Sequence, residues 1–342
     1  MGTTAISPSR ILKDLDALWL SLGEEQQHEP PVSGAAGASP VLRACAMTLI
    51  AVVDTDDVTV GETLAMLVRS HPSRLIVLTV APGDAPSLEA GVTAQCWMPF
   101  GKRQQICCEQ ISLSASRPSL QEIPPVIRGL IVPDLPVACW LRGRNLIQTP
   151  ELEGVIGLAD KLIVDSGGVA DLATQIGYIS THEGGVRRVG DLAWTRLTRW
   201  REAIAQLFDD AAGAQRAQRL ERIRIEYEGA HVPMSAYYLA AWLRHSLGRS
   251  LAVDIVRVGH FERARVCSVH LAEQASNVSI AVTSDRDVQL HAGARDAHTV
   301  FPRLSEYELL REELSVLGPD PVYEAVIAAV PALLAERQGA QS

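Results

Sequence analysis

One segment of the sequence has the residue types of an anion-binding site. Val164-Asp165-Ser166-Gly167-Gly168 follows an apolar stretch, at a point where a strand is expected to give way to a helix. Backbone N–H groups at such a point can hold a phosphate or a carboxylate. A tight turn requires the same residue types. Ser166, Gly167 and Gly168 are therefore a candidate anion-binding turn, and an ordinary structural turn is the alternative.

The sequence lacks the motifs of the common enzyme classes. It contains no G-x-x-x-x-G-K-[ST] phosphate loop, and no G-x-G-x-x-G follows the first expected strand. It also contains no H-E-x-x-H zinc motif, no G-x-S-x-G nucleophile elbow and no C-x-x-C pair. These absences count against an enzyme without excluding one, because catalytic groups can be scattered along a chain, and we expect no bound metal and no cofactor.

The cysteines and their neighbours are expected to have structural roles. The six cysteines, which we expect to be reduced, are Cys45, Cys96, Cys107, Cys108, Cys139 and Cys267. Cys107 and Cys108 are consecutive in an expected strand, so at most one should face the core, and a redox role for the other stays open. Glu109 is expected to face solvent or a partner, and Arg74 to bind the last carbonyls of the preceding helix.

The stretch from Asp191 to Asp210 has the most unusual composition in the chain. It predicts a helix capped by Asp191, with one apolar stripe that includes Leu197, Trp200 and Ile204. One interpretation is a core-facing helix whose arginine stems cover apolar surface. The other is a contact surface, because Trp and Arg are enriched in binding hot spots. The candidate partner-binding residues are Asp191, Trp194, Arg196, Trp200 and Arg201.

Composition and charge exclude several classes of partner. The 342-residue chain has a net charge of −9 and a pI of about 5.5, which argues against a nucleic-acid backbone as ligand. Its apolar stretches end after roughly ten residues, about half the length of a membrane-spanning helix. We therefore expect a cytoplasmic protein that binds neither nucleic acid nor membrane.

The order of expected elements predicts an α/β protein with two domains. Residues 1–40 should form an amphipathic helix (7–22) and a flexible linker, and the helix can dock on its own chain or on a neighbour. Residues 41–187 alternate continuous apolar runs with helices, as in a doubly wound-like mixed sheet. Residues 188–342 should form an α+β domain, with an antiparallel sheet, helices on one side and two terminal helices.

The same residues resemble a known family. Asp191-Leu-Ala-Trp-Thr-Arg-Leu197, with Trp200-Arg201 and Phe208-Asp209, resembles the most distinctive segment of the OpcA family of glucose-6-phosphate dehydrogenase assembly proteins. Further similar segments occur in the family's order, and the shared order covers roughly residues 40 to 250. They are His71-Pro-Ser-Arg74, Cys108-Glu-Gln-Ile111, Pro133-Asp-Leu-Pro136 and Ile163-Val-Asp-Ser166. The chain departs from the family at Leu141, where a second tryptophan is usual after Trp140.

The resemblance implies a non-catalytic partner that binds glucose-6-phosphate dehydrogenase, promotes its assembly into the active oligomer and activates it allosterically. Such a protein would act in the oxidative pentose phosphate pathway. The alternative, from a different class, is a sugar-phosphate-binding enzyme that uses the Ser166-Gly167-Gly168 turn as its anion site.

Overall fold

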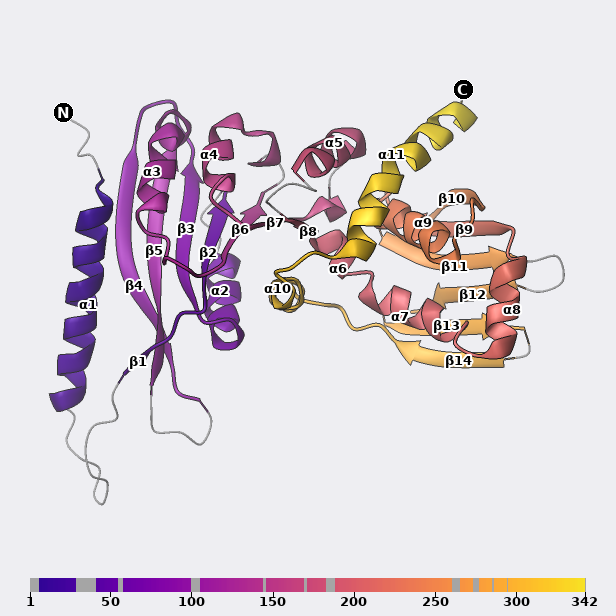
Figure 1. The fold of residues 1–342 in the computed structure, drawn as a ribbon, viewed down its shortest axis with the longest axis horizontal. Coiled ribbons are helices and arrows are strands. Elements are labelled where there is room, and N and C mark those ends of the chain that lie inside the picture. The colour runs from indigo at the N-terminus through magenta and orange to yellow at the C-terminus, as the bar shows by residue number, and fades with distance from the viewer. Residues whose placement is uncertain are drawn as a thin grey trace, which may run out of the picture. The chain divides into compact units, whose positions relative to one another are not determined.

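The chain forms two compact units, Met1–Val164 and Asp165–Ser342, which Figure 1 shows in colours from indigo to yellow along the chain. The computed structural model describes residues 6–28, 41–54, 58–99, 105–143, 146–168, 171–182, 188–259, 265–272, 277–284, 286–293 and 295–341. Within these ranges, no helix is both long and apolar enough to cross a membrane.

The first unit is an α/β unit built on a mostly parallel sheet. Its strands are β1 (Leu42–Arg43), β2 (Met47–Val53), β3 (Ser73–Ala81), β4 (Leu88–Trp97), β5 (Ile106–Ser116), β6 (Val137–Arg142) and β7 (Lys161–Val164). Its α-helices are α1 (Pro8–His28), α2 (Val58–Ser70), α3 (Ile123–Arg128) and α4 (Glu153–Ile156). Short 3-10 turns are η1 (Arg117–Glu122), η2 (Leu146–Gln148) and η3 (Pro150–Leu152).

The strand order in this unit is β1-β5-β3-β2-β6-β7, and β4 pairs with the other side of β5. All these pairs are parallel except β4 with β5, so the expected mixed sheet is confirmed. β2 lies at the centre and every one of its residues is buried. A continuous apolar run in the sequence therefore corresponds to a strand that is covered on both faces.

The N-terminal helix docks on its own unit. Ile11 and Leu15 of α1 are 3% and 2% exposed, and α1 lies along β4 (Figure 1). Trp19 donates from Nε1 to the Glu109 carboxylate at 2.7 Å. Glu109 is only 3% exposed, so our expectation that it faces solvent or a partner is wrong. The reason is that Trp19 of α1 packs onto this carboxylate.

Glu109 also binds two arginines. Arg74 donates from Nε to Glu109 at 2.7 Å and from Nη1 to the Leu130 carbonyl at 2.7 Å, while Arg43 forms an ion pair with the same carboxylate. Arg74 therefore does not serve the end of the preceding helix as expected, because a buried carboxylate offers it a stronger, charged partner.

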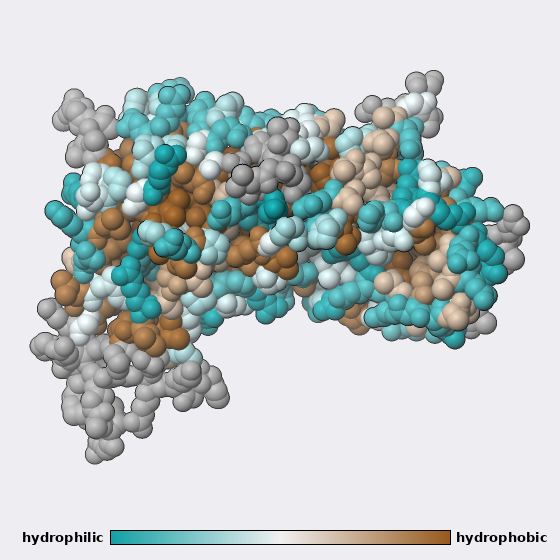
Figure 2. Space-filling view, in the orientation of Figure 1, coloured by the Kyte–Doolittle hydropathy of each residue, from teal (hydrophilic) through white to brown (hydrophobic). Residues whose placement is uncertain are grey.

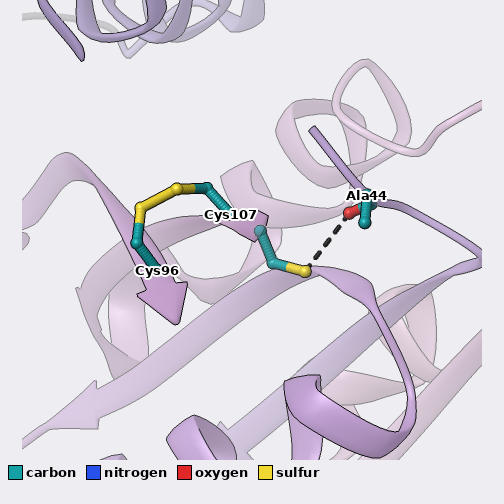
Figure 3. Close-up of a disulfide and its surroundings, with 4 residues drawn as sticks. Ala44, Cys96 and Cys107 are labelled. Carbon is teal, nitrogen blue, oxygen red and sulfur yellow. Dashed lines mark hydrogen bonds between the residues drawn. A yellow bond between two sulfur atoms is a disulfide. The ribbon is translucent and has the colours of Figure 1, made fainter. Parts of the chain in front are cut away.

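Two cysteines of the first unit form a disulfide, so the expectation that all six are reduced is wrong. Cys96 and Cys107 are directly paired across β4 and β5, with Cα atoms 4.1 Å apart (Figure 3). The next residue along β5, Cys108, has its side chain on the other face of the strand, and its Sγ donates to the Ala44 carbonyl at 3.2 Å. Both Cys107 and Cys108 are fully buried. The prediction that only one could face the core fails because both faces of β5 are covered here.

The second unit is an α+β unit. Its helices are α5 (Leu172–His182), α6 (Leu192–Thr195), α7 (Thr198–Gln206), α8 (Ala211–Arg219), α9 (Met234–Leu247), α10 (Glu306–Ser315) and α11 (Pro321–Gln341), with a 3-10 turn η4 (Ser166–Gly168). Its strands are β8 (Arg188–Asp191), β9 (Arg222–Glu228), β10 (Ala252–Gly259), β11 (Arg265–Ala272), β12 (Asn277–Val282), β13 (Asp287–Ala292) and β14 (Arg295–Val300).

Six of these strands form a sheet in the order β10-β9-β11-β12-β13-β14, which we call sheet B. The pairs from β9 to β14 are antiparallel, as expected, including the β12–β13 hairpin. β10 is the exception, because it runs parallel to β9. The chain crosses over through α9 between these two strands, and such a crossover returns the second strand in the same direction. Figure 1 shows α9 lying over the strands.

The long terminal helix α11 is apolar over most of its length. Its inner side is buried through residues such as Val326 and Val330, whereas its outer side carries small or apolar residues such as Val322, Ala328 and Ala332. In Figure 2 the visible side of α11 is accordingly tan rather than teal. α11 is held by these buried contacts and, near its C-terminal end, by the Arg244–Glu336 ion pair and by a hydrogen bond from Arg337 to the Ile255 carbonyl.

Candidate functional site

The candidate partner-binding segment starts at Asp191, the last residue of β8 and the N-cap of α6. Its Oδ1 accepts hydrogen bonds from the backbone N–H of Ala193 at 2.8 Å and of Ser166 at 3.0 Å. Its Oδ2 accepts a hydrogen bond from the Tyr238 hydroxyl at 2.7 Å. The predicted helix cap is thus confirmed. Asp191 is fully buried and also joins η4 and α9 to α6.

Burial strongly affects the acidity of this carboxyl group. Burial raises the pKa of Asp191 to about 6, and the nearby negative charge of Asp165 acts in the same direction. Hydrogen bonds from Ser166 and Ala193 work in the opposite direction and only partly offset the effect. Burial also raises the pKa of Tyr238 and of Tyr323 well above the ordinary range, so both hydroxyls stay protonated, and that of Tyr238 is the one that donates to Asp191.

The candidate anion-binding turn uses two of its backbone donors inside the chain. The Ser166 N–H donates to Asp191, and the Gly167 N–H donates to Asp165 Oδ1 at 2.9 Å. The two acceptors are carboxylates, which would repel a phosphate placed beside them. The geometry is that of a turn stabilised by the chain's own acidic side chains.

Arg196 closes this turn from the other side. Its Nη1 and Nη2 donate to the two carboxylate oxygens of Asp165 at 2.6 and 2.7 Å, a bidentate ion pair. Burial acts to lower the pKa of Arg196, but its bonds and ion pair with Asp165 outweigh burial and raise it. The arginine therefore connects the end of α6 to the start of the second unit.

Trp194 lies inside an aromatic cluster. Its ring is 5.5 Å from that of Tyr323 and 6.1 Å from that of Tyr238, and only 4% of the residue is exposed. The guanidinium of Arg201 lies 3.6 Å above the Trp194 ring, the geometry of a cation–π contact. The indole N–H donates to Asp320 at 3.4 Å. The tryptophan thus holds α6 against α9 and the start of α11.

Arg201 is itself partly enclosed. Its Nη2 donates to Thr198 at 3.0 Å, and its Nε is buried without a hydrogen-bond partner. Burial lowers the pKa of Arg201, while acidic groups led by Asp320 act to raise it. The nearby Trp200 is 7% exposed and packs edge-on against Phe301, with ring centres 5.2 Å apart.

Two threonines connect the segment to α10. Thr195 donates to Glu313 at 2.6 Å, and Thr198 donates to Glu312 at 2.7 Å. The predicted continuous helix is in fact two, because the Leu197 N–H bonds the Trp194 carbonyl three residues back and tightens the chain between α6 and α7. Helices α6 and α7 are thereby held to α10 through the threonines and to α11 through Trp194.

The geometry favours the core-facing interpretation for the tryptophans. The outward side of α7 includes Arg199 and Glu202, which are 56% and 49% exposed and form an exposed ion pair. Sequence reasoning did not find the partners Tyr238, Tyr323 and Asp320, because they lie far from the segment along the chain. Within the described ranges, no group of three or more His, Cys, Asp or Glu side chains is placed to hold a metal ion.

Comparison with known proteins identifies the family. Residues 65–180 match the family model described as the glucose-6-phosphate dehydrogenase subunit N-terminal domain, and residues 187–327 match the corresponding C-terminal domain. The chain belongs to the OpcA family. The boundary between the two matched regions lies just before Asp191, so the segment from Asp191 opens the match to the C-terminal domain, whereas its partners Asp165 and Ser166 lie in the match to the N-terminal domain.

OpcA proteins from cyanobacteria are among the relatives. The chain is 28% identical to the OxPP cycle protein OpcA of Synechocystis sp. over 191 residues, which are 55% of this chain and 39% of that protein. It is 28% identical to the OpcA of Nostoc punctiforme over 181 residues, 52% of this chain and 38% of that protein. These matches thus span about two fifths of the length of the curated relatives.

Among solved structures, biliverdin reductase from Synechocystis is similar to 84% of this chain and 98% of its own, with 11% identity and a TM-score of 0.46. Neither value supports transferring that protein's chemistry to this OpcA-family chain.

Proposed function

We propose that this chain is a non-catalytic partner of glucose-6-phosphate dehydrogenase, which it binds, helps to assemble into the active oligomer and activates. The match of both domains to models described as glucose-6-phosphate dehydrogenase subunits is the observation that carries the proposal. The relatives' names place them in the OxPP cycle, and we propose the same pathway, in the cytoplasm, for this chain. The acidic net charge of −9 fits a protein partner better than a nucleic acid.

The buried network supports such a role. The most perturbed carboxyl in the segment, Asp191, is fully buried, so it cannot touch a substrate. Trp194, Arg196 and Arg201 are likewise engaged with groups of the chain itself. In this proposal they fix α7 relative to α10, and the outward side of α7 at Arg199 and Glu202 forms part of the contact surface.

An activator of this kind works by binding the active state of its client more tightly than the inactive state. A typical coupling free energy of about 1 to 3 kcal/mol changes the client's substrate affinity by roughly 5- to 150-fold. The network serves this purpose because a rigid surface discriminates between two client states better than a mobile one.

The test is to mix the purified chain with the glucose-6-phosphate dehydrogenase of the same organism. Co-elution, the oligomeric state of the dehydrogenase and its apparent substrate affinity should all change on mixing. Arg199→Glu should weaken binding, because it reverses a charge on the proposed surface while leaving the buried network intact. Arg128→Glu, the same charge change on an exposed position of α3, is the matched control.

The double variant Arg196→Ala and Arg201→Ala tests the supporting network. It should reduce both binding and activation in a protein whose circular dichroism spectrum shows that it still folds. Unchanged binding and activation in that folded variant would contradict the role of the segment, and a wild-type chain with no effect on the dehydrogenase would refute the function itself.

A further inference from the structure

One face of sheet B has exposed side chains in the part of the second unit that the structure describes. Along β9, Ile223, Ile225 and Tyr227 are buried on the side that α9 covers, whereas the alternate residues point to the other side. On that other side Arg222 and Arg224 are 59% and 46% exposed. We call this side the open face.

The strand register arranges the open face in transverse rows. The first central row runs from β10 to β14 through Asp254, Arg224, His270, Ser279, His291 and Asp296. The second runs through Val256, Glu226, Ser268, Ala281, Gln289 and His298. Charged and polar side chains thus lie along both rows, and the smaller residues Ser279, Ser268 and Ala281 lie near the middle of the sheet.

Charges on β9 are arranged so that the open face complements itself. In chain order the strand presents Arg222 and Arg224, then Glu226 and Glu228, which is two positive side chains followed by two negative ones. Suppose that a second copy stacks its open face against this one, related by a two-fold axis. The axis lies midway between the two sheets and runs across the strands, parallel to the rows and between the two central ones. Each residue of one row then faces the residue of the other row on the same strand of the second copy. Arg224 then faces Glu226 of the second copy, and Arg222 faces its Glu228.

The same operation gives compatible neighbours elsewhere in the two rows. Asp296 of β14 faces His298 of the second copy, and Ser279 of β12 faces Ala281, where small side chains allow close approach. Among the residues of these two rows, like charges do not face each other. A two-fold contact requires one surface to be complementary to itself, and this face meets that requirement.

We propose that two copies of this chain associate through the open face of sheet B. Six strands about 4.8 Å apart and about six residues long cover roughly 500 to 600 Å² of sheet in each copy. The total of roughly 1,000 to 1,200 Å² is near the lower limit for a specific interface. The Arg224–Glu226 ion pair within one chain, at 2.8 Å, becomes part of a four-charge network in the pair.

Sedimentation velocity on the whole chain, at about 1 to 100 µM, tests the proposal. The wild type should dimerise in this range and should dissociate as salt is raised, because the contacts are ionic. Arg224→Glu should raise the dissociation constant at least about tenfold, since it places like charges opposite each other twice in each dimer. The matched control is Arg128→Glu, which has the same charge change on α3 of the other unit and should dimerise as the wild type does.

The decisive variant is the charge exchange Arg224→Glu with Glu226→Arg. It restores opposite charges across the proposed axis, so it should dimerise again. A wild type that stays monomeric throughout the concentration range overturns the proposal, as does an Arg224→Glu variant that dimerises normally. A charge-exchange variant that folds but stays monomeric overturns the stacked arrangement.

Discussion

Replacing Asp191 by asparagine should leave the second unit at least as stable at neutral pH, whereas replacing it by alanine should destabilise it. Asparagine keeps the Oδ1 acceptor for the two backbone N–H groups of Ala193 and Ser166. In the wild type the Tyr238 hydroxyl donates to the Asp191 carboxylate. In the variant the asparagine NH2 group can instead donate to the Tyr238 hydroxyl oxygen. Alanine removes the cap and leaves buried donors without acceptors.

The magnitude follows from the pKa of Asp191. Because the folded state raises this pKa from 3.8 to about 6, the folded chain holds a proton that the unfolded chain releases between those values. The free energy of unfolding therefore falls as pH rises through this window, by about 3 kcal/mol, and the loss is complete above about pH 6. Asp191→Asn has no proton to release at this position, so it removes this part of the pH dependence. Asp191→Ala should cost about 1 kcal/mol for the cap and about 1 to 3 kcal/mol for each stranded donor.

Urea unfolding at about pH 5 and about pH 7.5 should show about 1.4 kcal/mol of this loss, because pH 5 lies about one unit below the folded-state pKa, and hydrogen exchange in a peptide covering residues 188–201 gives the local readout. The stability difference between Asp191→Asn and the wild type should grow in favour of asparagine as pH rises. If asparagine destabilises as much as alanine at the higher pH, or if the wild-type pH dependence survives the substitution, the reasoning is refuted.

Three further predictions concern single contacts. Glu109→Ala should loosen α1, because Trp19 loses its hydrogen-bond acceptor and two arginines lose a buried counter-charge. Limited proteolysis should then cut the N-terminal region faster, and Glu109→Gln should be less affected. Cys96→Ser with Cys107→Ser should lower the free energy of unfolding by about 2 to 4 kcal/mol under oxidising conditions only, and an equal loss in excess dithiothreitol would contradict a disulfide contribution. Arg201→Met should cost about 1 to 2 kcal/mol through the lost cation–π contact, and a melting curve unchanged from wild type would rule out that contribution.

Much of the secondary structure could be predicted from the sequence because it depends on local patterns. The apolar run at β2, the alternation along β9 and the cap at Asp191 each predicted the observed element. Elements without such a pattern were missed. β14 is exposed along its whole length, so it shows no alternation, and α5 mixes β-branched residues and glycine with few helix formers.

The local sequence also determined which residue types are concentrated after Asp191, but only the tertiary structure decided what they do. Trp194 is buried because Tyr238, Tyr323 and Asp320 meet around it, and the last of these lies 126 residues away. The Cys96–Cys107 bond likewise required the register of β4 on β5. Periodicity reports which side of a helix or strand is apolar, whereas the identity of the group packed against that side depends on contacts between distant parts of the chain.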